Sequence, residues 1–256
     1  MTKLTEIDGY QIDILVQGYP GKTVCHGGLG WSTIVLIRGH GRVALVDTGG
    51  FGVRKVLIDQ LAHHGLKPAD VTDLLLTHAH HDHCISWVLF PKARIVIGAS
   101  ELAWAVREPW GETPVPELYV RELKTWPTVH EAANGEEVMP AITAHVAAGH
   151  TPGHLVYVLR GRERDVIFCG DAAKNRAELL TGKADMSYDP AVTAASIATI
   201  WTFWRRRPGN IVVPGHDIPM VQKDGRPAYL VNREAAIKAW FGDDLDTMTT
   251  VSLTVA

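Results

Sequence analysis

Metal-capable side chains recur along this chain in short clusters. Four of them fall within residues 77–84, which read Thr-His-Ala-His-His-Asp-His-Cys, and three more follow apolar stretches or sit in glycine-rich turns. The set is His78, His80, Asp82, His83, His150, Asp171 and His216. Imidazole and carboxylate ligands together suit Zn, Mn or Fe. These seven ligands exceed what one tetrahedral ion takes, but they fit two neighbouring ions that share a carboxylate and a water, which favours a two-metal hydrolytic centre.

Short β-branched and apolar segments alternate with helical spacing along the chain. Strands are expected over residues 11–17, 33–38, 42–46, 73–76, 94–98, 142–146, 155–159, 165–168 and 210–213. The spacing also predicts a helix over residues 53–64, with Val56, Leu57 and Leu61 on one face. Further helices should begin at Ser100, acting as N-cap, and at Asp189-Pro190, the latter running toward Arg207.

Two segments are less regular. Residues 101–128 give no secondary-structure prediction. In the C-terminal tail, the spacing of apolar residues predicts a helix over residues 233–240 and an edge strand over residues 249–255. Both segments are candidates for a contact between copies in a homodimer.

The two halves of the chain repeat one order of elements. Strand 42–46 leads to Asp47, a helix and a strand that ends at His78, while strand 165–168 leads to Asp171, a helix and a strand that ends at His216. This order predicts a pseudo-duplicated α+β fold, a four-layer αββα sandwich with its reactive groups at strand ends. Because no linker-like or low-complexity segment interrupts it, we expect residues 1–256 to form a single domain.

Bulk composition excludes several classes of partner. The net charge of −3 and a single basic run at residues 205–207 give no drive toward nucleic acid or a membrane surface. The three cysteines form no CxxC pair, which suits a reducing compartment. The first residues lack the apolar core of a signal peptide, so we expect a cytoplasmic protein with a small-molecule substrate.

Residues 78–83 match the pattern His-Xaa-His-Xaa-Asp-His, which resembles the signature of the metallo-β-lactamase superfamily. The resemblance extends over nearly the whole chain. It includes the segments at residues 46–49, 149–154, 170–171 and 213–216. It implies that His78, His80 and His150 bind a first metal, that Asp82, His83 and His216 bind a second, and that Asp171 bridges them. It also implies that Asp47 orients a ligand imidazole, and we expect His154 to brace its turn or the ligands behind the site.

The motifs favour some branches of the superfamily over others. Asp171 disfavours true β-lactamases, which usually lack the bridging acid, and His80 disfavours flavodiiron oxidases, which carry an acid there. The turn at residues 149–154 is similar to that of lactonases. Residues 47–50 and 213–216 resemble the group that includes metallo-β-lactamase domain-containing protein 1. Lys174 is a departure, because several lactonases have a Tyr at that place.

The expected activity is hydrolysis of a small carbonyl substrate, a lactone, cyclic amide or ester, by a hydroxide held between two divalent ions. Zn²⁺ is the expected metal, with Mn or Fe as alternatives, and Asp82 and Asp171 are the acids expected at the reacting atoms. Trp31, Trp104 and Trp110 are candidates for an apolar pocket wall, with core packing as the alternative. A phosphodiesterase or nuclease, and a mononuclear iron thiol dioxygenase, are the alternative functions.

Overall fold

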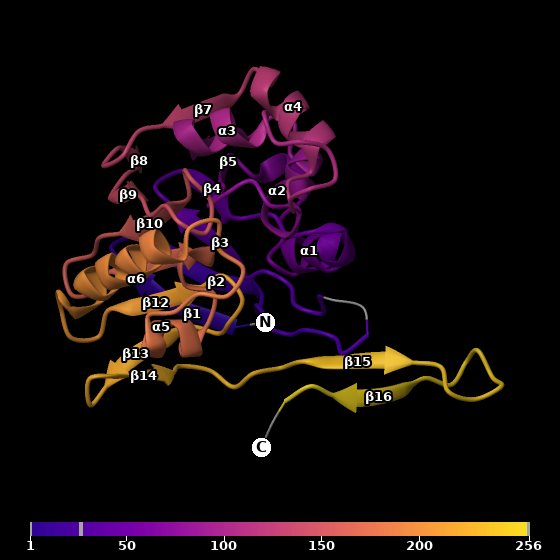
Figure 1. Ribbon diagram of the computed structural model, residues 1–256. Helices are drawn as coiled ribbons and strands as arrows, with labels where there is room; N and C mark the ends of the chain where they lie inside the picture. The colour runs from indigo at the N-terminus through magenta and orange to yellow at the C-terminus, as the bar shows by residue number, and fades with distance from the viewer. Residues whose placement is uncertain (1, 26–27, 255–256) are drawn as a thin grey trace.

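Two β-sheets form the body of the protein (Figure 1). The computed structural model describes residues 2–25 and 28–254. The first sheet runs in the order β1 (Thr2–Ile7), β2 (Tyr10–Val16), β3 (Ile34–Gly39), β4 (Arg42–Val46), β5 (Asp73–Leu75), β6 (Arg94–Gly98) and β7 (Val129–Ala132). The second runs in the order β14 (Arg226–Tyr229), β13 (Met220–Lys223), β12 (Ile211–Pro214), β11 (Val166–Gly170), β10 (Leu155–Leu159), β9 (Ile142–Val146) and β8 (Glu137–Met139).

Helices cover the outer face of each sheet. The first sheet is covered by α1 (Arg54–His63), α2 (His81–Cys84), α3 (Ala99–Ala105) and α4 (Glu117–Thr125). The second is covered by α5 (Arg176–Thr181) and α6 (Pro190–Arg205). Short 3-10 helices complete the connections: η1 (Phe51–Val53), η2 (Pro68–Asp70), η3 (Ile85–Leu89) and η4 (Asp171–Ala173). The predicted four-layer αββα sandwich is confirmed.

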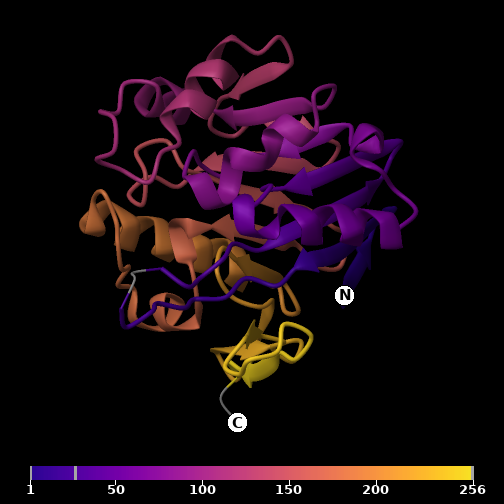
Figure 2. The ribbon, with the colours of Figure 1, turned by 90° about the vertical axis from the view of Figure 1, so that its right-hand side faces the viewer.

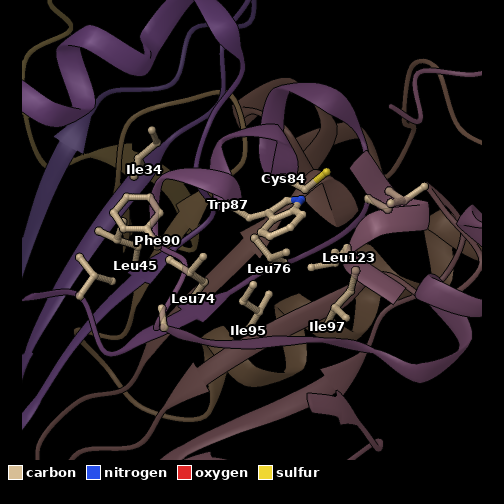
Figure 3. Close-up of a cluster of buried hydrophobic side chains, with 14 of the residues drawn as sticks. Ile34, Leu45, Leu74, Leu76, Cys84, Trp87, Phe90, Ile95, Ile97 and Leu123 are labelled. Atoms are coloured by element: carbon tan, nitrogen blue, oxygen red, sulfur yellow. The ribbon is translucent and has the colours of Figure 1, made fainter. Parts of the chain in front are cut away.

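The alternation of side chains along the strands explains this layering. In β3, Ile34 and Leu36 pack toward the helices, whereas Val35 and Ile37 pack toward the other sheet. Successive side chains of a strand point to opposite faces, so a strand that is apolar throughout must be covered on both sides. Figure 3 shows the helix-side cluster, where Trp87 and Phe90 lie with Leu74 of β5 and with Leu76, which follows this strand. Each fully buried side chain of this kind stabilises the fold by about 1.5–3 kcal/mol.

The repeated order of elements becomes a repeated geometry. The strands β4 and β5 are parallel neighbours, and so are β11 and β12, each pair being joined through helices. Parallel neighbours end at the same edge of a sheet. The residues that follow these four strands therefore emerge in pairs, and they include Asp47, His78, Asp171 and His216.

Three predictions about the helices are wrong. Residues 233–240 do not form a helix, because β15 (Ala236–Ala239) pairs with β16 (Thr249–Ser252) in a hairpin that leaves the body (Figures 1 and 2). Ser100 is not an N-cap, since the chain turns directly from Gly98 into α3. Val56 is 44% exposed, so the buried face of α1 carries Leu57 and Leu61 alone of the three. The predicted edge strand ends at Ser252, and Val255 lies outside the described residues.

The segment that gave no prediction contains most of α3 and all of α4. The helix predicted from Asp189 begins at Pro190, with the Asp189 carboxylate accepting from the backbone N–H groups of Ala191 and Val192. Across the described residues, no helix combines the length and apolar character needed to cross a bilayer.

Candidate metal centre

The predicted ligands converge from both sheets. His78 follows β5, and α2 carries Asp82 and His83 one turn further on. His150 lies in the turn between β9 and β10, while Asp171 and His216 follow β11 and β12. Six of the seven residues are buried, and the Asp82 side chain is 25% exposed. The centre is therefore enclosed, with Asp82 on its more open side.

The possible ligand atoms form three overlapping groups. The first triad consists of His78, His80 and His150, the second triad consists of Asp82, His83 and His216, and a third group joins His78, His83 and Asp171. The ligand atoms of each group lie within 4.8 Å of one another. In the second triad, Nε2 of His83 lies 3.2 Å from Nε2 of His216, which lies 3.3 Å from Oδ2 of Asp82. The first and second triads are the two ligand sets that the resemblance implied.

Asp171 lies between the two triads. Its Oδ2 is 3.3 Å from Nε2 of His150 and 3.3 Å from Nε2 of His216. Its Oδ1 is 3.2 Å from Nε2 of His83. One carboxylate thus faces ligand nitrogens of both triads, the position that a bridging ligand requires.

Asp47 fixes the orientation of His83. Its Oδ2 lies 2.7 Å from Nδ1 of His83, and its Oδ1 accepts from the backbone N–H of Thr77 at 2.8 Å. This contact fixes the ring of His83 so that its Nε2 faces Asp171 and His216. Asp47 has a φ of +57°, a left-handed conformation that Asp tolerates better than most residues.

His154 contacts two of the candidate ligands, Asp171 and His78. Its Nε2 accepts from the backbone N–H of Asp171 at 3.0 Å, and its ring stacks on that of His78 with centroids 4.9 Å apart. Burial lowers the pKa of His154 to about 3, so the ring is neutral. The nitrogen that accepts this hydrogen bond is engaged, and His154 is not a member of the His and Asp groups of the described residues that could hold an ion.

Glu101 is a residue that the sequence did not single out. Its fully buried carboxylate accepts from the backbone N–H of Ala79 at 2.9 Å and from that of Gly153 at 3.0 Å. It therefore ties the loop of His78 and His80 to the turn of His150. Burial raises the pKa of Glu101 to about 7. No local sequence pattern predicts this role, because both hydrogen-bond partners of Glu101 are backbone groups that are distant in sequence.

The charges of the centre suit cations. Burial lowers the pKa of His78 and His150 well below the usual range, so both are neutral ligands. Burial alone would raise the pKa of Asp171, but His216, His83 and His150 hold it well below the usual range. Burial likewise opposes the charge on His216, yet Asp171 and Asp82 raise its pKa to about 9. Positive charge is therefore strongly favoured beside Asp171 and Asp82.

The donor atoms fit metal ions. Nε2 of His78 is buried without a hydrogen-bond partner, while Nδ1 of the same ring contacts the Thr77 hydroxyl at 3.0 Å. Nε2 of His83 and Nε2 of His216 face each other at 3.2 Å, and each also faces an oxygen of Asp171. Buried polar groups normally have a hydrogen-bond partner. Imidazole nitrogens and carboxylates that converge in this way would gain partners by binding divalent cations.

The three tryptophans named as pocket candidates lie in different surroundings. Trp104 is buried, with its ring centroid 6.3 Å from that of His80 and 6.1 Å from that of Tyr188. Trp31 stacks on Tyr19, and its neighbour Ser32 donates to the backbone oxygen of Asp82. Trp110 is 59% exposed beneath the guanidinium of Arg121. The structure therefore brings Trp104 to the candidate centre and Trp110 to the outer surface, while Trp31 packs against Tyr19.

Two neighbours of the ligands are engaged elsewhere. His81 is exposed, although it lies inside the motif, and its backbone N–H donates to Pro114. Lys174 donates to Glu178 at 3.0 Å and to the backbone oxygen of Asp185 at 2.6 Å. Tyr188, which the sequence did not single out, is exposed beside Trp104, and its backbone N–H donates to the oxygen of His150.

The structure thus combines a two-sheet sandwich with a buried His and Asp cluster that lies at its strand ends. The chain belongs to the metallo-beta-lactamase superfamily, whose family model matches residues 27–216. Human metallo-beta-lactamase domain-containing protein 1 is 45% identical over 182 residues, which cover 68% of this chain and 58% of the human protein. An N-acyl homoserine lactonase of Agrobacterium fabrum is 24% identical over 222 residues, covering 81% and 83% of the two chains.

Solved structures share the fold. A protein of Staphylococcus aureus, described as a probable metal-dependent hydrolase, matches with a TM-score of 0.73 at 17% identity, covering 91% of this chain and all of that one. A Bacillus thuringiensis protein with N-decanoyl-L-homoserine bound at its active site matches with a TM-score of 0.67 at 16% identity, covering 84% and 95%. At these identities the likeness concerns the fold alone.

Proposed function

We propose that this protein hydrolyses a small carbonyl substrate, a lactone, cyclic amide or ester, at a centre of two divalent metal ions, with Zn²⁺ as the preferred metal. The observation that carries the proposal is the position of Asp171, whose Oδ2 lies 3.3 Å from Nε2 of both His150 and His216. A carboxylate shared between two ligand sets is a feature of two-metal hydrolases.

The residues divide into two binding sets. His78, His80 and His150 would hold one ion, and Asp82, His83 and His216 the other, with Asp171 bound to both. Two ions held in this way lower the pKa of a bound water and polarise the carbonyl under attack. Asp47 and Glu101 keep the ligands in place through the contacts described above.

Asp82 and Asp171 are the groups proposed to transfer protons. Asp82 and Asp171 are ionised beside His83 and His216, which hold the pKa of both carboxyls well below the usual range. Ionised carboxylates accept protons rather than donate them. Asp82 is also the more exposed of the two, so it is placed to take a proton from water and return it to the departing alkoxide or amide.

The surroundings favour an apolar substrate. Trp104 lies edge-on to His80, and Tyr188 lies edge-on to Trp104, which together offer an aromatic wall beside the first triad. A wall of this kind suits the acyl chain of a lactone or ester. The likeness to an N-acyl homoserine lactonase supports the same substrate class.

The proposal is tested by assaying the metal-loaded protein against acyl lactones of several chain lengths, esters, cyclic amides and a chromogenic phosphodiester. His80→Ala should abolish turnover, whereas His81→Ala, in the same motif but exposed, should retain it. Turnover of the phosphodiester without turnover of any carbonyl substrate would overturn the proposed substrate class. Equal loss in both variants would overturn the assigned ligands.

We also propose a cytoplasmic location. Cys84 and Cys169 are buried free thiols, and free thiols suit a reducing compartment. Fractionation of cells that express the untagged protein tests this, and recovery in a membrane or secreted fraction would contradict it.

A further inference from the structure

The C-terminal hairpin, residues 236–252, is an arm that projects from the body (Figure 1). Its base is tied down, because Gln17 bonds the backbone of both Asn232 and Glu234 and the Tyr19 hydroxyl donates to the oxygen of Leu253. Beyond this base, every residue from 240 to 252 is exposed. The arm is therefore held in a fixed direction without being covered.

The arm exposes several apolar side chains to solvent. Its exposed apolar residues are Ile237, Trp240, Phe241, Leu245, Met248 and Val251. Phe241 is 73% exposed and Leu245 is 83% exposed. A lone two-stranded hairpin is marginally stable, and contiguous exposed apolar side chains of this kind mark contact surfaces. The tip is also acidic, since Asp243, Asp244 and Asp246 lie among residues 240–248, which include no basic residue.

A complementary surface lies on the same chain, around α4. We name it the α4 patch, and it consists of Phe51, Arg54, Trp110, Leu118 and Arg121. Phe51, Trp110 and Leu118 are 59%, 59% and 64% exposed. The guanidinium of Arg54 lies 4.3 Å from the ring centre of Phe51, and that of Arg121 lies 4.7 Å from the ring centre of Trp110. The patch thus combines apolar rings with two guanidinium groups, with the Glu117 carboxylate near Arg121, whereas the tip of the arm is apolar and acidic.

The α4 patch adjoins the metal centre. A Cβ on Gly50, which precedes Phe51, would lie 3.3 Å from Cα of Asp82. The backbone N–H of His81 bonds the oxygen of Pro114, in the loop between Trp110 and α4. In both ribbon views the arm lies at the opposite end of the molecule from α4, so the chain does not cover its own patch (Figures 1 and 2).

We propose that the arm of one copy packs on the α4 patch of a second copy, forming a twofold dimer in which the partner's arm completes the rim of the metal centre. A second copy is the occupant that fits, because arm and patch are on one chain and a twofold axis makes both contacts at once. Opposite charges set the orientation.

The test is sedimentation equilibrium of the full chain across nanomolar to micromolar concentrations. Phe241→Ser with Leu245→Ser removes apolar contacts of the tip but keeps the Trp240 indole bond to the backbone oxygen of Leu245. This variant should raise the dimer dissociation constant by at least about 100-fold, and Arg121→Glu by at least about 10-fold. Val192→Ser, an exposed apolar change on α6, serves as the control and should leave it unchanged.

A mixing experiment separates this contact from pairing between two arms. The arm variant and Arg121→Glu, mixed in equal amounts, should associate more tightly than either alone, because one intact arm then meets one intact patch. Circular dichroism confirms that each variant is folded. A monomer at every concentration, or a dimer insensitive to the arm variant, overturns the proposal. Sensitivity to the arm variant without sensitivity to Arg121→Glu overturns the assigned patch.

Discussion

Oδ2 of Asp47 lies 2.7 Å from Nδ1 of His83, deep behind the second ligand triad. The contact fixes the ring of His83 and points its Nε2 toward Asp82 and His216. Asp47 is itself fixed by the backbone N–H of Thr77. A buried acid thus determines how a candidate metal ligand is oriented.

Replacing Asp47 should weaken metal binding without unfolding the protein. Asn tolerates the left-handed conformation at this position but loses the charge opposite His83. Asp47→Asn should lower the affinity of the second site by about 10- to 100-fold. Competition against a chromogenic chelator measures this, with Asp59→Asn on the exposed face of α1 as the control. An unchanged affinity would mean that Asp47 has no orienting role.

The approach of Gly215 to Asp171 gives a second prediction. A Cβ at residue 215 would lie 2.2 Å from Oδ1 of Asp171 and 2.6 Å from the backbone oxygen of Gly170. Gly215→Ala should therefore displace the carboxylate, reduce metal content and destabilise the fold by about 1–3 kcal/mol. Gly52→Ala, where a Cβ meets open space, is the control. Normal metal content in Gly215→Ala would show that the Asp171 position is not critical.

The buried Glu101 predicts a dependence of stability on pH. Because its pKa is raised to about 7 in the folded protein, the folded state binds a proton between about pH 4.5 and 7 that the unfolded state has released. The free energy of unfolding should then fall as pH rises through this window, by up to about 3 kcal/mol from this group. Glu101→Gln cannot titrate, so its stability relative to the natural protein should rise by that amount.

Urea unfolding of the metal-free protein between pH 5 and 8 measures the Glu101 effect, and Glu163→Gln at an exposed position serves as the control. Parallel profiles for the natural protein and Glu101→Gln would show that the buried carboxyl titrates normally. A difference in the free energy of unfolding that is constant over pH reflects the hydrogen bonds to Ala79 and Gly153. The two carboxylate oxygens of Glu101 accept both bonds, whereas the side chain of Gln has one oxygen.

Trp104 predicts a preference for apolar substrates. Its ring lies beside His80 and Tyr188, so Trp104→Phe should raise KM for long acyl chains by about tenfold and change KM for short ones less. Trp201→Phe on α6 is the control. Steady-state kinetics over a series of chain lengths tests this, and an equal change for every length would remove Trp104 from the acyl wall.

The sequence predicted most of the sandwich because its strands are strongly apolar and bounded by turns. Residues 94–98 form β6 as predicted, and the parallel pairs follow from the repeated order of elements. The tail could not be predicted in this way. Residues 233–240 have helical spacing, but Ala236–Ala239 pair with β16, and this pairing satisfies their backbone groups instead.

Four of the seven candidate ligands were visible in sequence because they lie together within residues 78–83, and the other three because each lies in a motif of the family that the chain resembles. The supports behind the ligands were visible only in part. Asp47 was found through its motif, whereas Glu101 was not, since its partners Ala79 and Gly153 are backbone groups that carry no side-chain signal. Trp104 and Trp110 looked alike in sequence, and only packing separates the buried ring from the exposed one.

The position of Asp171 between the two triads is the central claim, and metal content tests it most directly. Elemental analysis of protein purified without added metal should give about two divalent ions per chain, and Asp171→Asn should reduce this to about one or fewer while retaining the fold. About one iron per chain, unchanged in Asp171→Asn, would contradict the bridging role and direct attention to oxidative chemistry.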